Sequence, residues 1–123
     1  MMASSYLQAR EHRRQVVEGL RHALALEKID ALILPTTPGP ALRRGETMLE
    51  LESGLTLHRD AQLALTAPFS VAGVPVAAIP FGRLDGLPIG LQLVTRWGED
   101  ALGLNLASWT ERLLAEPFAV QRR

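Results

Sequence analysis

Three side chains in the middle of the chain have the residue types of a hydrolytic triad. His58 and Asp60 precede Ser70, and serine, histidine and aspartate together can activate a hydroxyl for attack on a carbonyl. Adjacent residues of a strand point to opposite faces, however, so His58 and its neighbour Arg59 cannot both serve one site without a bulge. The sequence around Ser70 also lacks a Gly-x-Ser-x-Gly elbow. An independent small enzyme that uses His58 as general base is therefore the least favoured hypothesis.

Few other groups could bind a metal or act as nucleophiles. The chain has no cysteine, which excludes disulfides and thiolate chemistry and fits a reducing compartment such as the cytoplasm. His12 and His22 lie ten residues apart, about 80° apart around a helix, whereas metal-binding pairs on a helix favour a spacing of four. We therefore expect no metal site and no cofactor.

The length of the chain indicates one domain over residues 1–123. The 13 basic and 13 acidic side chains balance, so no net charge favours nucleic acid or an anionic membrane as a partner. No apolar run reaches the roughly 20 residues of a membrane span. We expect a cytoplasmic protein.

The most apolar stretch, residues 74–95, predicts a hairpin. Two apolar runs, 74–81 and 88–95, lie on either side of Asp85-Gly86, a pair that favours tight turns between strands. Neither run alternates apolar with polar residues, so we expect strands that are buried on both faces in the middle of a layered sheet. Gly73, just before the first run, suggests a close backbone approach.

Helices and shorter strands are expected on either side of this hairpin. Residues 5–27 predict a helix with Ser4 or Ser5 as its cap, and Glu99-Asp100 begin a second helix that ends near residue 115. The apolar stripe of the second helix is expected at Leu102, Leu106, Trp109 and Leu113. Residues 31–34 predict a strand that Pro35 ends, and residues 48–58 a small surface hairpin. The predicted fold class is α/β, with a partial mixed sheet of about three to five strands between an N-terminal and a C-terminal helix.

Two threonines follow the strand that ends at Pro35. Thr36 and Thr37 could line a crevice, because crevices form at the carboxyl ends of strands in open α/β sheets. Their hydroxyls could also satisfy the backbone of the turn, which is the favoured interpretation.

Three sequence motifs follow one another along the chain. They are Asp-Ala-Leu-Ile-Leu-Pro-Thr-Thr-Pro from residue 30, Pro-Phe-Ser-Val-Ala-Gly-Val-Pro from residue 68, and Gly-Leu-Pro-Ile-Gly-Leu-Gln-Leu-Val from residue 86. In this order they resemble the C-terminal portion of the amidase signature family, and the resemblance covers nearly the whole chain. The segment from Gly45 is most similar to enzymes that act on small urea-derived amides such as biuret.

The resemblance implies hydrolysis or transfer of carboxamides by a serine nucleophile, a second serine and a lysine base. The sequence has no Gly/Ser-rich run, and its one lysine, Lys28, follows a predicted helix. No catalytic residue is therefore assigned in this chain. By resemblance, the candidates for substrate contacts are Thr37, Arg59, Asp60, Gln62 and Ser70, with Arg59, Asp60 and Gln62 at the end that recognises an amide or carboxylate.

Two hypotheses for the function remain. The leading one is the C-terminal part of an amidase, inactive alone, that completes the sheet and the pocket while another segment supplies the nucleophile. The second is a non-catalytic assembly or regulatory module that pairs through its sheet edge, because uncovered apolar strands usually find a partner. Both imply self-association or a partner chain that carries the amidase catalytic core.

Overall fold

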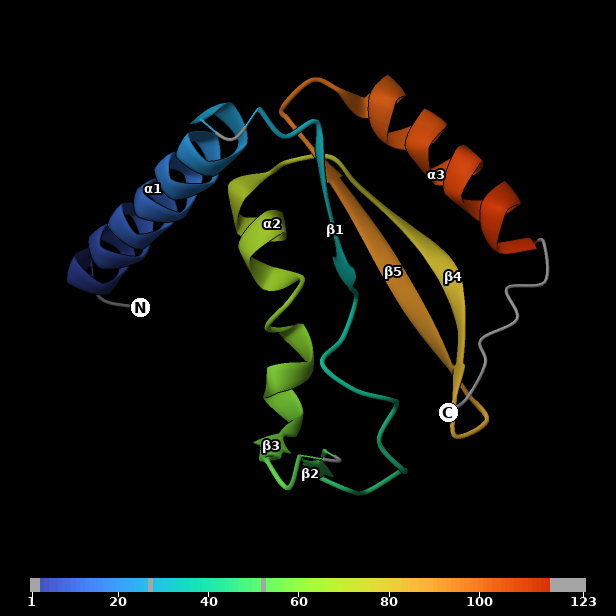
Figure 1. Ribbon diagram of the computed structural model, residues 1–123. Coiled ribbons are helices and arrows are strands. Elements are labelled where there is room, and N and C mark those ends of the chain that lie inside the picture. Colours follow the sequence, from blue (N-terminus) through green and yellow to red (C-terminus); the bar gives the residue numbers. More distant parts are fainter. Residues whose placement is uncertain (1–2, 27, 52, 116–123) are drawn as a thin grey trace.

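The computed structural model describes residues 3–26, 28–51 and 53–115. Its elements, in chain order, are α1 (Ala3–Leu26), β1 (Ala31–Pro35), β2 (Met48–Glu50), β3 (Thr56–His58), the 3₁₀ helix η1 (Arg59–Leu63), α2 (Ala67–Ala72), β4 (Val76–Leu84), β5 (Leu87–Thr95) and α3 (Asp100–Ala115). The α/β class and the two flanking helices are confirmed (Figure 1).

One antiparallel sheet of three strands, in the order β1-β5-β4, replaces the expected mixed sheet. The central hairpin is confirmed, and Asp85 (φ 51°) and Gly86 (φ 79°) make its turn. β2 and β3 pair antiparallel as the small separate hairpin expected at residues 48–58.

The two halves of the β4–β5 hairpin differ in how well they are covered, and a register shift between Pro80 and Gly82 divides them. We call residues 76–80 and 90–95 the packed half, and residues 81–84 and 87–89 the open half. The four residues from Gln92 to Thr95 are all buried, whereas β4 is exposed from Pro80 onward. The expected burial on both faces is therefore confirmed for residues 92–95 of β5. It is wrong for β4, where Val76, Ala78 and Pro80 are exposed, and for the open half.

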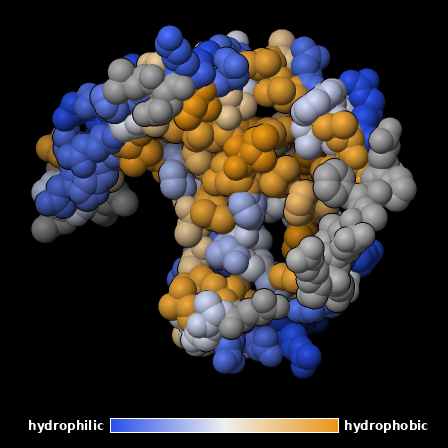
Figure 2. Space-filling model, viewed as in Figure 1, coloured by the Kyte–Doolittle hydropathy of each residue, from blue (hydrophilic) through white to orange (hydrophobic). Residues whose placement is uncertain are grey.

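Helices cover both faces of β5 in the packed half. On one face, Val94 packs with residues of α1 and α2, among them Val17, Leu20 and Phe69. On the other face, Leu93 and Ile79 pack against Ala107 of α3. The end of α3 lies beside Phe81 and Gly82, at the start of the open half. Figure 2 shows hydrophobic side chains gathered at the centre of one face of the molecule, over β1 and the sheet.

Two buried polar side chains tie the packed half to its surroundings. The Gln92 side-chain amide donates to the carbonyl oxygens of Pro35 (3.0 Å) and Leu65 (2.8 Å). The Thr95 hydroxyl donates to the carbonyl oxygen of Glu99 at 3.2 Å, just before α3. Buried polar groups are stabilising only when they are hydrogen-bonded. These contacts therefore hold β5 against β1, against the segment that precedes α2, and against the start of α3.

α3 contacts the sheet through the small residues Gly103 and Ala107, with Leu106 and Leu114 packed beside them. Gly103 and Ala107 are buried, whereas Trp109 of the predicted apolar stripe is 55% exposed and Leu113 is 44% exposed. A Cβ added at Gly103 would lie 3.3 Å from the Thr95 hydroxyl oxygen. The predicted stripe is therefore partly wrong, because close packing of helix on sheet selects small side chains that a hydrophobic pattern does not highlight.

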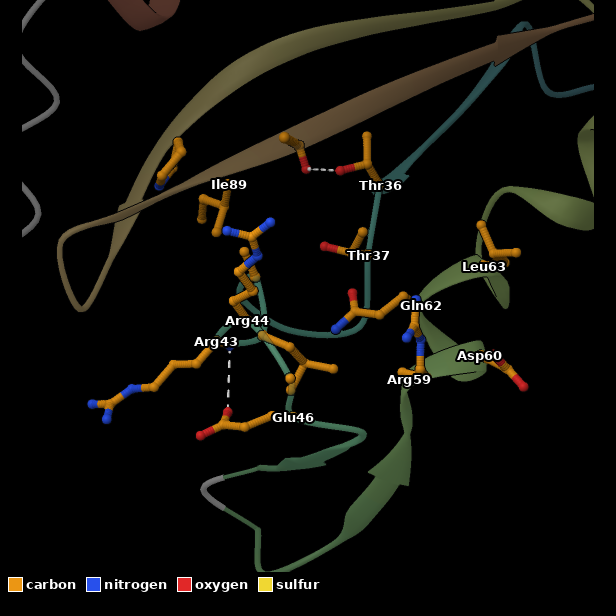
Figure 3. A pocket seen from close by; sticks show the side chains of 15 residues that line it. Thr36, Thr37, Arg43, Arg44, Glu46, Arg59, Asp60, Gln62, Leu63 and Ile89 are labelled. Atoms are coloured by element: carbon orange, nitrogen blue, oxygen red, sulfur yellow. Dashed lines mark hydrogen bonds between the residues drawn. The ribbon is translucent and has the colours of Figure 1, made fainter.

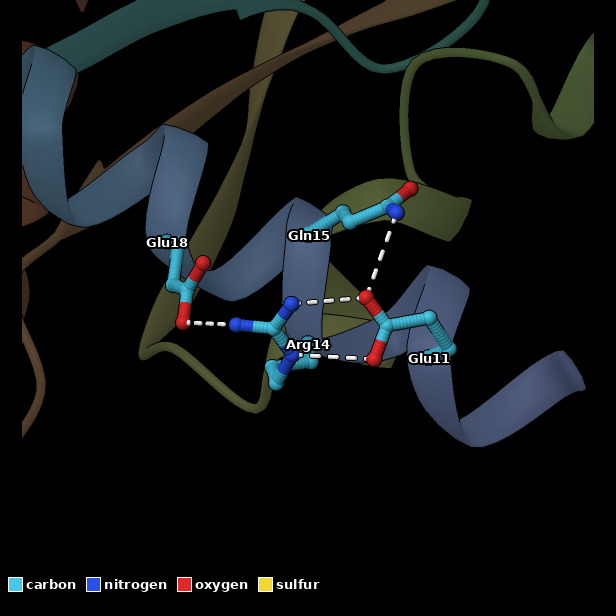
Figure 4. Close-up of polar contacts among 4 residues, drawn as sticks. All are labelled: Glu11, Arg14, Gln15 and Glu18. Atoms are coloured by element: carbon cyan, nitrogen blue, oxygen red, sulfur yellow. Dashed lines mark hydrogen bonds and ion pairs between the residues drawn. The ribbon is translucent and has the colours of Figure 1, made fainter. Parts of the chain in front are cut away.

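The outer face of α1 carries a network of charged side chains (Figure 4). Arg14 bridges Glu11 at 2.7 Å and Glu18 at 2.6 Å, and its hydrogen bond lowers the pKa of the Glu11 carboxyl below the ordinary value. All three are exposed, so they support the helix locally and form no buried site. Ser4 and Ser5, the expected caps, lie inside α1, which begins at Ala3.

The short helix α2 lies in a stretch for which the sequence predicts no helix. Gly73 ends it with φ 74°, a left-handed conformation that glycine adopts without strain. An added Cβ at Gly73 would contact nothing within 4 Å, so its expected role in a close backbone approach is wrong. None of the described helices combines the length and the apolar character needed to cross a membrane.

Candidate functional site

An open cleft of about 770 Å³ lies beside the open half of the hairpin. Its walls are the segment that follows β1, the turn at residues 43–46, η1 and the start of β5 (Figure 3). Segments far apart in the sequence meet here because β1 and β5 are neighbours in the sheet and the Gln92 side chain connects both to the segment before α2.

The cleft brings together most of the residues for which the resemblance implies substrate contacts. Thr37, Arg59, Asp60 and Gln62 all line it. Ser70 does not line it: this residue lies on α2, is exposed, and donates its backbone N–H to the carbonyl oxygen of Thr66 at 3.1 Å.

The two threonines after β1 satisfy the backbone, as the favoured interpretation expected, and also line the cleft. The Thr36 hydroxyl donates to the carbonyl oxygen of Gly90 at 3.2 Å, and the Thr37 hydroxyl donates to that of Gly39 at 2.8 Å. A Cβ added at Gly90 would lie 2.8 Å from the Thr36 hydroxyl oxygen. A glycine at position 90 therefore lets the β1 end and β5 approach this closely.

η1 directs its side chains in different ways. Gln62 donates to the carbonyl oxygen of Pro40 at 3.3 Å and so joins the two walls of the cleft. Asp60 contacts His58 at 3.2 Å, its side chain is 83% exposed, and Figure 3 shows it directed away from the cleft. Arg59 begins a helical turn rather than continuing a strand, so the alternation that was expected for His58 and Arg59 does not apply.

The described residues that line the cleft do not form a complete set of catalytic residues. Its described lining residues include no serine, lysine, histidine or cysteine. The hydroxyls of Thr36 and Thr37 donate to backbone carbonyls, and the carboxylates of Glu46 and Asp60 contact the Arg43 backbone N–H and the His58 ring, so none of these groups is paired as nucleophile and base. Within the described part of the chain, no group of three or more His, Cys, Asp or Glu side chains is placed to hold a metal ion. Hydrogen-bond donors, positive charge and an apolar floor can bind and orient a small polar molecule, but they supply no nucleophile.

Sequence reasoning missed the turn that carries Arg43, Arg44 and Glu46. All three line the cleft. The signal was present, because the order Arg-Arg-Gly-Glu places a glycine third in a four-residue turn. Gly45 adopts φ 92° there.

The chain is similar to known amidases in sequence and in structure. The sequence model of the family described as Amidase matches residues 1–104. A solved structure titled "Crystal structure of amidase" is 40% identical with a TM-score of 0.83, over 92% of this chain and 26% of that one.

Two further proteins extend the likeness. A structure whose title describes a vestigial protein complex and the evolutionary origins of an s-triazine catabolic enzyme is 33% identical, with a TM-score of 0.77, over 92% of this chain and 25% of that one. A glutamyl-tRNA(Gln) amidotransferase protein of Methanosarcina barkeri is 46% identical over 70 residues, which are 57% of this chain and 14% of that protein. The chain thus spans about a quarter or less of the length of these three proteins, and it belongs to the amidase signature family.

Proposed function

We propose that this chain forms the C-terminal wall of a site that hydrolyses or transfers carboxamides. The observation that carries the proposal is a cleft lined by family-matched segments, whose described lining residues include neither a serine nor a lysine. The serine and lysine that the resemblance implies would come from a complementary segment, which we define as the part of the solved amidase that this chain does not match.

The division of labour follows from the chemistry. Attack of a serine oxygen on the amide carbonyl releases the amine, and water then releases the acid and restores the serine. In this scheme the complementary segment performs both steps. The cleft residues Thr37, Arg59 and Gln62 hold the rest of the substrate.

The exposed apolar side chains of the open half support the proposal that another segment packs there. Phe81, Leu84 and Leu87 are 48%, 41% and 40% exposed. Leu84 pairs with Leu87, and Phe81 and Leu84 line one hollow. Clustered apolar surface of this kind usually marks a contact with another segment or chain. The complementary segment would cover this apolar surface. The place we propose for the protein is the cytoplasm, a reducing compartment that suits a sequence without cysteine.

A chimaera tests the proposal. In it, these 123 residues replace the matching part of the 40% identical amidase, and hydrolysis of a small amide is measured by ammonia release. We expect the chimaera to hydrolyse the amide, and the chain alone and the amidase without its matching part to be inactive. A chimaera that folds cooperatively but is inactive would contradict the proposal, as would activity of the chain alone that a substitution within it abolishes.

A non-catalytic assembly module is the second candidate. The observation in its favour is that β4 lies at one edge of the described sheet, paired only with β5, and open edges pair readily with other strands. Sedimentation at micromolar concentration separates the cases. Stable self-association together with an inactive chimaera would favour the module over the amidase wall.

A further inference from the structure

Gln92 lies next to the cleft along β5 but does not line it. Side chains two residues apart in a strand point to the same face, so Gln92 shares a face of β5 with Pro88 and Gly90, which do line the cleft. Gln92 is 1% exposed. Its side chain is therefore the first buried one on this face of β5, directly behind the cleft.

The Gln92 side-chain amide joins two walls of the cleft. Its nitrogen carries two hydrogens and donates to the carbonyl oxygens of Pro35 at 3.0 Å and of Leu65 at 2.8 Å. Pro35 ends β1 and leads directly into one wall of the cleft. Leu65 lies at the end of the opposite wall, residues 59–65, which we call the η1 wall. One buried side chain thus contacts the backbone of both walls.

The wall that follows β1 has further attachments to β5. Thr36 donates to the carbonyl oxygen of Gly90 through its backbone N–H at 3.0 Å and through its hydroxyl at 3.2 Å. The pairing of β1 with β5 continues from there to Ala31 and Thr95. This wall therefore keeps its place on β5 without the Gln92 amide.

The η1 wall has a single direct attachment of this kind. Within the described part of the chain, the hydrogen bond from Gln92 to Leu65 is the only one that joins the η1 wall to β1, β4 or β5. Gln62 donates to the carbonyl oxygen of Pro40 at 3.3 Å, but Pro40 belongs to the loop after β1. The direct polar attachment of the η1 wall to the sheet thus depends on one buried side chain.

We propose that Gln92 is a positioning residue, which sets the distance of the η1 wall from β5 and thereby the place of Arg59 and Gln62 against the substrate. In the proposed function these two residues hold the substrate, while the complementary segment supplies the nucleophile. Displacement of the η1 wall should therefore weaken substrate binding more than it slows the chemical step. This inference rests on the proposed function and adds a residue behind the cleft that controls binding within it.

Hydrogen exchange in the chain alone tests the positioning without any activity. Gln92→Met keeps the shape of the side chain but removes both donors. The Ala64 N–H, which donates to the carbonyl oxygen of Ala61 at 2.9 Å, should exchange about tenfold faster because the η1 wall loses its attachment. The Thr36 N–H should keep its exchange rate. Equal acceleration of both amides, or no change in either, would overturn the inference.

Thr95→Val is the matched control. Thr95 is also buried on β5, and its hydroxyl donates to the carbonyl oxygen of Glu99 at 3.2 Å, away from the cleft. The substitution removes a buried donor of the same strand without changing a contact of either wall. We expect it to destabilise the chain with no selective effect on Ala64. Selective acceleration of Ala64 in this control would overturn the inference, because any loss of stability in β5 would then release the η1 wall.

Kinetics of the chimaera separate this inference from the proposed function. If the unsubstituted chimaera is inactive, the proposed function fails, while hydrogen exchange still decides whether Gln92 positions the η1 wall. In an active chimaera, Gln92→Met should raise the KM for a small amide about tenfold and change kcat by less than about twofold. A merely structural role would lower the folded fraction, and hence the apparent kcat, with KM unchanged. We expect that second pattern in Thr95→Val, and finding it in Gln92→Met would contradict the inference.

Discussion

The packed half and the open half of the β4–β5 hairpin have similar sequences and different surroundings. Ile79, Leu91 and Leu93 contribute to the cluster under α3, whereas Phe81, Leu84 and Leu87 are 40% or more exposed. The sequence of a hydrophobic strand therefore does not predict whether another element covers it. In the packed half the helices of this chain provide the cover, and in the open half we propose that the complementary segment does.

The largest expected contrast is between two leucines of β5. Leu93 is 1% exposed and Leu87 is 40% exposed. Leu93→Ala should lower the free energy of unfolding by about 2–5 kcal/mol, because it leaves a cavity between the sheet and α3. Leu87→Ala should lower it by less than about 1 kcal/mol. Urea denaturation followed by circular dichroism measures both, and equal losses would remove the distinction between the two halves.

Gln92 gives a second, polar test of the packed half. Gln92→Met keeps the shape of the side chain but leaves the Pro35 and Leu65 carbonyl oxygens without their shared donor. We expect a loss of about 1–3 kcal/mol in the same assay. Gln62→Met, which removes one contact at the partly exposed cleft, serves as the control and should cost less. A larger loss in the control would mean that the cleft, rather than the packed half, holds the fold together.

Gly90 stands where the two halves of β5 meet. In Gly90→Ala the new methyl group would meet Thr36 at 2.8 Å, so we expect a loss of about 1–2 kcal/mol from overpacking. Thr36→Ala removes the hydroxyl and methyl groups that the new Cβ would meet. The double variant should therefore be more stable than the sum of the two single effects predicts, and simple additivity would argue against a direct contact.

The smallest effect is expected in α1, which helps to cover the packed half. Gly19 is exposed inside this helix and an added Cβ would contact nothing within 4 Å. Gly19→Ala should raise the free energy of unfolding by about 0.5–1 kcal/mol. An unchanged value, with more helical signal, would indicate that α1 unfolds separately from the packed half.

Much of the fold follows from local sequence signals. The Asp85-Gly86 turn and the apolar runs around it predict the hairpin, and the acidic start at Asp100 predicts α3. Which side of α3 meets the sheet does not follow from them. Gly103 and Ala107 are buried because they are small, and this depends on the shape of the strand surface beneath them.

The site was less accessible from sequence than the fold. Resemblance to a family directed attention to Arg59 and Gln62, and the structure places both at the cleft. Arg44 was missed because its place depends on a turn whose meeting with β5 is set by the sheet order. Short-range patterns contain no information on which distant segments meet.

Hydrogen exchange in the chain alone and in the chimaera tests most directly whether the open half is a surface for the complementary segment. In the chain alone, the amides of residues 81–84 should exchange much faster than those of residues 92–95. In the chimaera, protection should rise in residues 81–84 and stay the same in residues 92–95. Equal protection of both halves in the chain alone, or no gain in a folded chimaera, would contradict the account.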